Sequence, residues 1–97
     1  MLRHVVMFRF AADAPAEAVE KTAAGLSALP GLIEEIETYR FGRDLGLRAG
    51  NFDFCLVAEF ADAEAFARYV DHPAHRRFIR ECIEPAVSER VAVQYEV

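Results

Sequence analysis

The segment Phe52–Phe60 constrains the fold more than any other part of the chain, because its side chains alternate strictly between two faces. A period of two residues is typical of a β-strand. One face consists of Phe52, Phe54, Leu56, Ala58 and Phe60, and the other of Asp53, Cys55, Val57 and Glu59. Both faces are apolar at their centre, so we expect both sides of the sheet that contains this strand to be covered.

Three further segments have the character of strands. Arg3–Phe10 also alternates with period two. Leu32–Phe41 is rich in β-branched and aromatic residues, but its pattern changes phase, which predicts a bulge or an irregular start. The last is Arg90–Val97, whose valines share one face. A loop over 42–51 with three glycines precedes Phe52–Phe60.

A first helix is expected between Arg3–Phe10 and Leu32–Phe41. Asp13 is its expected N-cap, with Pro15 in the first turn, and Pro30-Gly31 ends it. Its apolar stripe recurs at helical spacing and consists of Val19, Ala23, Leu26 and Leu29.

A second helical region follows Phe60 and is expected to be broken once. Asp62 is its expected N-cap, and Pro73 predicts a kink at His72 because proline removes a backbone hydrogen bond. The apolar stripe of the first piece is Ala63, Phe66 and Val70, and that of the second, which Pro85 closes, is Phe78, Ile79, Cys82 and Ile83.

The resulting order, β-α-β-β-α-β, predicts a ferredoxin-like α+β fold, and 97 residues suffice for one domain, 1–97. Two helical segments cover only one face of a four-stranded sheet. The other face retains an apolar centre of Val5, Met7, Cys55 and Val57. Because a second copy would cover such a patch with the fewest new requirements, we expect a homodimer through the open sheet face.

Composition excludes several classes of partner. The net charge of −5 argues against binding nucleic acid, which requires a basic face. The apolar runs are shorter than the roughly 20 residues that span a bilayer, so no membrane partner is expected. The first ten residues lack a signal-peptide core, which predicts a cytoplasmic protein. Cys55 and Cys82 are expected to be buried thiols rather than a disulfide.

The segment Tyr69-Val70-Asp71-His72-Pro73-Ala74-His75 carries the chemistry of the chain. Histidine changes charge near neutral pH, and His4 faces the same side of its strand as other core residues. A neutral imidazole could take a proton from a carbon next to a carbonyl, while the hydroxyl of Tyr69 stabilises the enolate oxygen.

Two alternatives remain open for these residues. In a structural interpretation, His75 bonds a carbonyl or caps a helix, Tyr69 belongs to the core, and His72 orders the kink. In a metal-site interpretation, His72 and His75 share a helix face and His4 supplies a third ligand, but Pro73 disturbs the spacing, so no metal is expected.

The chain resembles the stress-responsive α/β-barrel (Dabb) family over nearly its whole length. The residues that carry the resemblance are Arg3-His4-Val5-Val6-Met7-Phe8, Gly42, Asp44, Phe52-Asp53-Phe54, Glu59-Phe60, Tyr69-x-x-His72-Pro73-x-His75 and Pro85. The resemblance implies a dimeric α+β barrel. A minority of the family resembles plant polyketide cyclases, which work without a cofactor; the matching positions are Tyr69 and His75, with His4 as a further pocket histidine. Those cyclases carry another histidine where this chain has Phe54, so a more apolar pocket is expected.

The functional prediction is a cofactor-independent enzyme of cyclase or lyase type that acts on a small carbonyl or polyketide-like compound. Phe8, Phe54, Phe66 and Phe78 are expected to line a site for a small apolar or aromatic ligand. Arg76, Arg77 and Arg80 either gather an anionic substrate at its mouth or form a solvated helix surface. The alternatives are a non-catalytic stress-responsive or ligand-binding protein and a cofactor-independent oxygenase, since a fold alone does not determine function.

Overall fold

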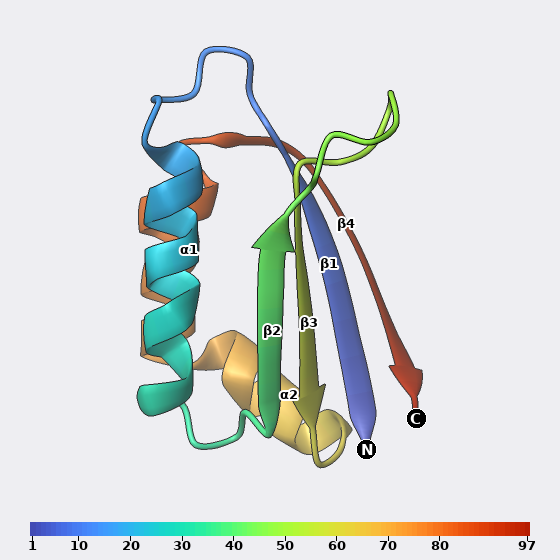
Figure 1. Ribbon diagram of the computed structural model, residues 1–97. Helices are drawn as coiled ribbons and strands as arrows, with labels where there is room; N and C mark the ends of the chain where they lie inside the picture. Colours follow the sequence, from blue (N-terminus) through green and yellow to red (C-terminus); the bar gives the residue numbers. More distant parts are fainter.

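The computed structural model describes residues 1–97 and has the predicted ferredoxin-like order (Figure 1). Its elements are β1 (Leu2–Phe10), α1 (Ala18–Ala28), a 3₁₀ turn (Leu29–Gly31), β2 (Thr38–Arg43), β3 (Phe54–Phe60), α2 (Ala63–Asp71), α3 (Pro73–Phe78), a π-helical turn (Ile79–Ile83) and β4 (Val87–Glu96). The strands form one antiparallel sheet in the order β2-β3-β1-β4. No helix is long and apolar enough to cross a membrane.

The helices form a single layer on one face of the sheet (Figure 1). The core lies between this layer and the sheet, and His4, Val6 and Phe8 of β1 are buried in it. On β3 the buried residues are those of the predicted aromatic face, Phe54, Leu56, Ala58 and Phe60. Because strand side chains alternate, the odd-numbered residues of β1 and β3 face the side without helices.

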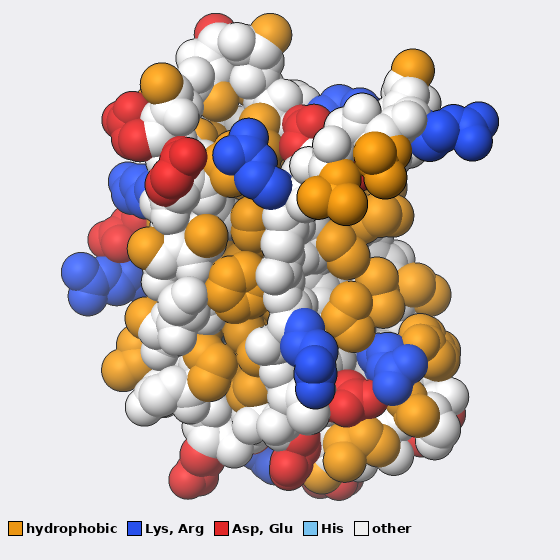
Figure 2. Space-filling model, viewed as in Figure 1, with side chains coloured by type: hydrophobic (Ala, Val, Ile, Leu, Met, Phe, Trp, Pro, Cys, Tyr) orange, Lys and Arg blue, Asp and Glu red, His pale blue; other side chains and the backbone are white.

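The open face of the sheet is wider than the sequence pattern indicates. Val5 of β1 lies opposite Val57 of β3 on one side and Val93 of β4 on the other, and Met7 lies between Cys55 and Val91. The predicted apolar centre is therefore present, and β4 enlarges it. Figure 2 shows hydrophobic side chains on both sides of β2, against α1 and toward the side without helices.

The prediction for the start of the first helix is wrong. Asp13 does not cap it: the helix begins at Ala18, the residue before it is Glu17, and no side chain caps the first turn. The chain instead forms two turns, in which the amides of Ala14 and Ala18 donate to the carbonyls of Ala11 and Pro15. These backbone bonds carry the chain through two turns before the helix begins. Leu26 and Leu29 of the predicted stripe are buried as expected, whereas Ala18 and Thr22 are buried in place of Val19 and Ala23, which are half-buried.

Only the second half of the segment Leu32–Phe41, which is predicted to be a strand, is a strand in the structure. The chain turns as far as Glu37, because the amides of Leu32 and Ile33 both donate to the carbonyl of Leu29. Ile33 is a β-branched residue of the type common in strands, but its side chain is fully buried in this turn. The strand itself runs from Thr38 to Arg43.

Two other strand limits differ from the prediction. β3 begins at Phe54 rather than Phe52; just before it, the amide of Asp53 donates to the carbonyl of Phe8 and a side-chain oxygen of Asp53 accepts from the amide of Phe10 at 2.8 Å. β4 begins at Val87, three residues before Arg90, where it pairs with Phe10 across a register shift.

The second helical region follows the prediction except along the stripe of its first piece; in the second piece Phe78, Cys82 and Ile83 are buried as expected. Asp62 caps α2 by accepting from the amide of Ala65 at 2.8 Å, and the chain kinks at His72 as predicted. Ala63 and Val70, expected in the core, are exposed. Ala65 and Tyr69 are buried in their place, with Phe66 half-buried beside them.

Candidate functional site

Three side chains from three elements meet beneath α2. His4 comes from the covered face of β1, Tyr69 from the buried stripe of α2, and His75 from the first turn of α3. The rings of Tyr69 and His75 are 4.4 Å apart between centroids, and those of His4 and Tyr69 are 6.4 Å apart. Phe66 completes the group, with its ring 4.9 Å from that of His4. The structure thus brings together the three residues that the sequence singled out for acid–base chemistry.

The kink at His72 positions His75. The Nδ1 atom of His72 accepts from the amide of Ala74 at 3.0 Å and so caps α3, while Pro73 occupies the first helical position, where it loses no hydrogen bond. The turn brings Nδ1 of His75 to 3.0 Å from the carbonyl oxygen of Val70. A carbonyl only accepts, so Nδ1 of His75 carries the proton and Nε2 is the basic nitrogen of the neutral ring.

His4 has the opposite arrangement. Nε2 of Gln94 lies 2.9 Å from Nδ1 of His4. The amide nitrogen donates, so Nδ1 of His4 accepts and its Nε2 carries the proton. The pair therefore offers one basic nitrogen, on His75, and one N–H donor, on His4.

The hydroxyl of Tyr69 is bonded to that of Tyr39, a residue of β2 that the sequence did not single out. The two oxygens are 2.6 Å apart, and the rings meet edge to face. Burial raises the pKa of Tyr69 to about 12, although the bond to Tyr39 and the charge of Arg90 both act to lower it. The pKa of Tyr39 is raised as well, first by burial and then by Tyr69. Both hydroxyls are protonated at neutral pH.

Burial has the reverse effect on the two imidazoles, because it disfavours their charged form. The pKa of His4 falls to about 4, chiefly by burial and also through the charges of Arg90 and His75. The pKa of His75 is lowered by burial first, with Arg90 and His72 adding to the effect and the bond to Val70 opposing it. Both rings are neutral at pH 7, which is the form that a general base requires.

The four phenylalanines predicted to bind a ligand lie in three places. Phe66 belongs to the site. Phe8 and Phe54 contact each other in an aromatic group on the sheet together with Phe10 and Phe41. Phe78 packs under α1, against Gly25. Phe66 is therefore the only one of the four whose ring contacts both His4 and Tyr69.

A groove of about 410 Å³ borders the site at His75. Its other lining residues are Val70, Asp71, Arg76, Ile79, Arg80 and Glu84. Tyr69 does not line the groove: it contacts the ring of His75 and is itself 2% exposed. Of the arginines considered for an anionic substrate, Arg76 is paired with Asp71 and Arg77 with Glu81, while Arg80 lines this groove.

Sequence reasoning missed Tyr39, Gln94 and Arg90. The phase change within Leu32–Phe41 hides which face Tyr39 occupies. Gln94 and Arg90 are polar residues on an exposed strand, so only the pairing of β4 with β1 puts Gln94 opposite His4 and Arg90 opposite Phe8, on the same face. No group of three His, Cys, Asp or Glu side chains lies close enough to hold a metal ion, so the three histidines do not form the metal site considered above.

Comparison with known proteins identifies the family. Residues 2–97 match the model of the Stress responsive A/B Barrel Domain, Dabb. An uncharacterised protein of Streptomyces coelicolor is 33% identical over 79 residues, which cover 78% of this chain and 80% of that protein.

Solved structures agree with the fold. A dimeric ferredoxin-like protein of unknown function from Thermobifida fusca has a TM-score of 0.90 at 42% identity, covering 99% of this chain and 90% of that one. The hydroxynitrile lyase of Passiflora edulis has a TM-score of 0.86 at 23% identity, covering 99% and 92%. The chain belongs to the stress-responsive A/B barrel domain family.

Proposed function

We propose that this protein catalyses a cofactor-independent acid–base reaction, of cyclase or lyase type, on a small carbonyl compound. The observation that carries the proposal is the pair formed by Tyr69 and His75. A neutral imidazole with a free Nε2 lies in ring contact with a protonated hydroxyl-bearing ring, at the edge of a groove. These are the groups that removal of a proton next to a carbonyl requires.

The proposed step conserves its proton. Nε2 of His75 takes the proton from the carbon next to the carbonyl, and the electron pair moves to the carbonyl oxygen. The hydroxyl of Tyr69 and the Nε2–H of His4 donate to that oxygen as its negative charge grows. The protonated His75 then returns the proton to the product. A positioned acid or base typically contributes about 10²–10⁴-fold to such a rate.

The lyase from Passiflora edulis supports the proposal to a limited extent. Its name shows that an enzyme of lyase type exists on this fold, and at 23% identity the likeness concerns the fold. The argument for this chain therefore rests on the arrangement of its own residues.

A second function is favoured by the close packing of Tyr69. Its side chain is 2% exposed and its hydroxyl already has Tyr39 as a partner, which is also how a satisfied core tyrosine looks. A non-catalytic protein that binds a small apolar or aromatic ligand in the groove would need no more than this.

Exchange of hydrogen for deuterium distinguishes the two functions without knowledge of the product. The measurement is the loss of the proton signal next to the carbonyl of small ketones in D₂O. The wild type is expected to accelerate exchange, and His75→Ala or Tyr69→Phe to slow it about 10²-fold or more while remaining folded. The double variant should be little worse than the weaker single one, because residues that act as a unit are not additive.

Arg48→Gln is the control, since Arg48 lies in the loop between β2 and β3 and takes no part in the site. The catalytic proposal is wrong if both site variants melt early and exchange is unchanged. Binding without exchange would favour the second function.

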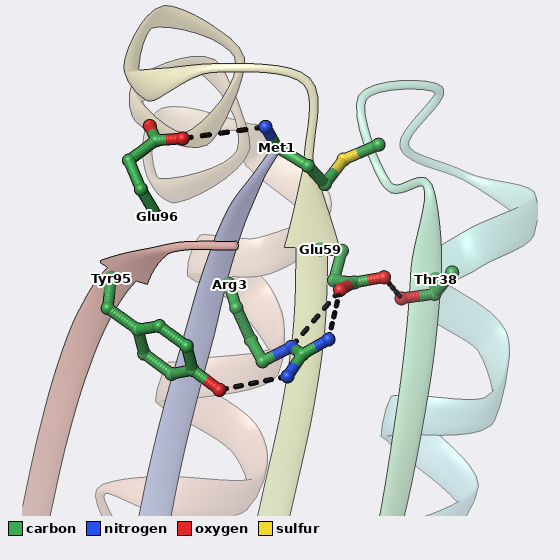
Figure 3. A network of polar contacts seen from close by, with 6 residues as sticks. All are labelled: Met1, Arg3, Thr38, Glu59, Tyr95 and Glu96. Atoms are coloured by element: carbon green, nitrogen blue, oxygen red, sulfur yellow. Dashed lines mark hydrogen bonds and ion pairs between the residues drawn. The ribbon is translucent and has the colours of Figure 1, made fainter.

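We also propose that the protein is a homodimer that assembles through the open sheet face. The Thermobifida fusca structure is described as dimeric, and the apolar centre of the face lies between two polar ends. At one end Arg3 donates to Glu59 at 2.8 Å and to Tyr95 at 2.9 Å, and Thr38 donates to Glu59 at 3.0 Å (Figure 3). At the other, Arg9 pairs with Glu89. Paired charges around an apolar centre suit an interface.

A further inference from the structure

Arg90 lies on the same face of β4 as the partner of His4. In the pairing of β1 with β4, Arg90 is opposite Phe8 and Gln94 is opposite His4. Phe8 and His4 both face the helices, and the bond from Gln94 to His4 shows that the even-numbered residues of β4 face that way too. The side chain of Arg90 therefore leaves the strand on the side of the candidate site.

The positive charge of Arg90 is not neutralised. Two arginines around the site have a carboxylate partner within 4 Å, Arg76 with Asp71 and Arg77 with Glu81. Arg80 and Arg90 have no such partner. Arg90 is exposed, so a molecule entering from solvent can reach it. Its charge also lowers the pKa values of His4, Tyr69 and His75, which belong to three different elements.

We propose that Arg90 makes the site selective for a carbonyl compound that also carries a carboxylate. This inference rests on the proposed function, to which it adds the substrate class. A guanidinium binds a carboxylate through two parallel hydrogen bonds, which gives orientation as well as affinity. With the carboxylate on Arg90, the rest of the molecule is directed toward His4 and His75, where the carbonyl would react.

The charge of Arg90 has no carboxylate partner within the fold. This charge disfavours protonation of His4 and His75. Because Arg90 forms no ion pair, its charge does not stabilise the fold through such a pair. A carboxylate supplied by the substrate would provide the missing partner. The acidic residues of the adjacent groove do not take this role, because Asp71 is paired with Arg76 and Glu84 forms no ion pair with Arg90.

The test compares a charged and an uncharged probe that otherwise differ by one methyl group, 4-oxo-4-phenylbutanoate and its methyl ester. Both carry the ketone and the flat apolar ring expected of a ligand. Dissociation constants would be measured by NMR titration for the wild type, Arg90→Gln, Arg90→Lys and Arg48→Gln. Arg48 is the matched control, an arginine of the loop between β2 and β3 that also lacks an ion pair.

We expect the wild type and Arg48→Gln to bind the acid about tenfold more tightly than the ester, since only the carboxylate forms two charge-assisted hydrogen bonds with a guanidinium. Arg90→Gln should lose this preference and Arg90→Lys should keep part of it. Equal binding of acid and ester by the wild type, binding of neither, or an unchanged preference in Arg90→Gln would overturn the proposal.

A second measurement checks that Arg90 acts at the site. The pKa values of His4 and His75, followed by NMR, should rise in Arg90→Gln and stay unchanged in Arg48→Gln. The other groups that face His75 are His72, Asp71, Arg76, Arg80 and Glu84, and all are present in both variants. The proposed function is tested separately by hydrogen–deuterium exchange at the carbon next to the ketone, which the wild type should accelerate and His75→Ala should not. A carboxylate preference without such exchange would refute the catalytic role and leave Arg90 as a ligand-binding residue.

Discussion

His4 shows how one buried residue links the stability of this protein to its possible chemistry. The ring is 4% exposed, and its only hydrogen bond comes from Gln94 on the edge strand. Burial keeps it neutral, with a pKa of about 4. A neutral ring with an N–H donor can bind a growing negative charge at an oxygen, and a charged one would be costly to keep in the core.

The protein is therefore expected to lose stability as the pH falls from about 6.5 to about 4. In this window the unfolded chain binds a proton at His4 and the folded chain does not, so protonation favours unfolding. The loss from this residue should reach about 3 kcal/mol at pH 4, relative to pH 7. Urea unfolding at several pH values would measure it, with His4→Asn as the comparison. If the variant shows the same dependence on pH, His4 is not the source.

At the scale of elements, the contact between α1 and α3 depends on a glycine. A Cβ atom added at Gly25 would lie 2.7 Å from the ring of Phe78 and 3.3 Å from the sulfur of Cys82. Phe78 follows the kink at His72 on the same short helix as His75. The close approach of α1 therefore helps to hold the helix that presents the candidate base.

Gly25→Ala is expected to destabilise the protein by about 1 kcal/mol, although alanine is the better helix former by a similar amount. The clash outweighs the gain in propensity, because a contact of 2.7 Å requires the buried ring of Phe78 to shift. Gly31→Ala is the matched control, since nothing lies within 4 Å of the added atom. Thermal unfolding would measure both, and a higher melting temperature for Gly25→Ala would contradict the packing argument.

At the scale of the whole molecule, the helices cover one side of the sheet and leave the other side open in the single chain (Figure 1). The open face has Val5, Met7, Cys55 and Val57 at its centre, with Val91 and Val93 of β4 beside them. Met7 and Val93 are 38% and 56% exposed in the single chain. Apolar side chains so exposed on one face favour association.

Val57→Glu is expected to convert the dimer into a monomer. An unpaired charge at the centre of an apolar interface is costly on each of the two copies. Ala67→Glu, on the exposed side of α2, should leave the dimer intact. Sedimentation at micromolar concentration measures the result. A monomeric wild type, or a dimeric Val57→Glu, would show that the open face is not the interface.

Local patterns in the sequence are sufficient to predict the order of the elements and the faces of the central strands. The alternation in Phe52–Phe60 and Arg3–Phe10 identifies their buried side, and Asp62 and Pro73 mark the start and the kink of the second helical region. Prediction from local patterns fails where backbone bonds replace side-chain signals, as at Asp13, and where a buried turn imitates a strand, as at Ile33.

The candidate site also contains residues that the sequence predicts and residues that it does not. Tyr69, His75 and His4 are recognisable by residue type, because few side chains suit proton transfer at neutral pH. Their partners are not, since the bond of Gln94 to His4 spans 90 positions and that of Tyr39 to Tyr69 spans 30. The sequence by itself thus determines which residues can carry the chemistry. Only strand pairing and helix packing, which join distant segments, decide which nitrogen is basic and which cation faces it.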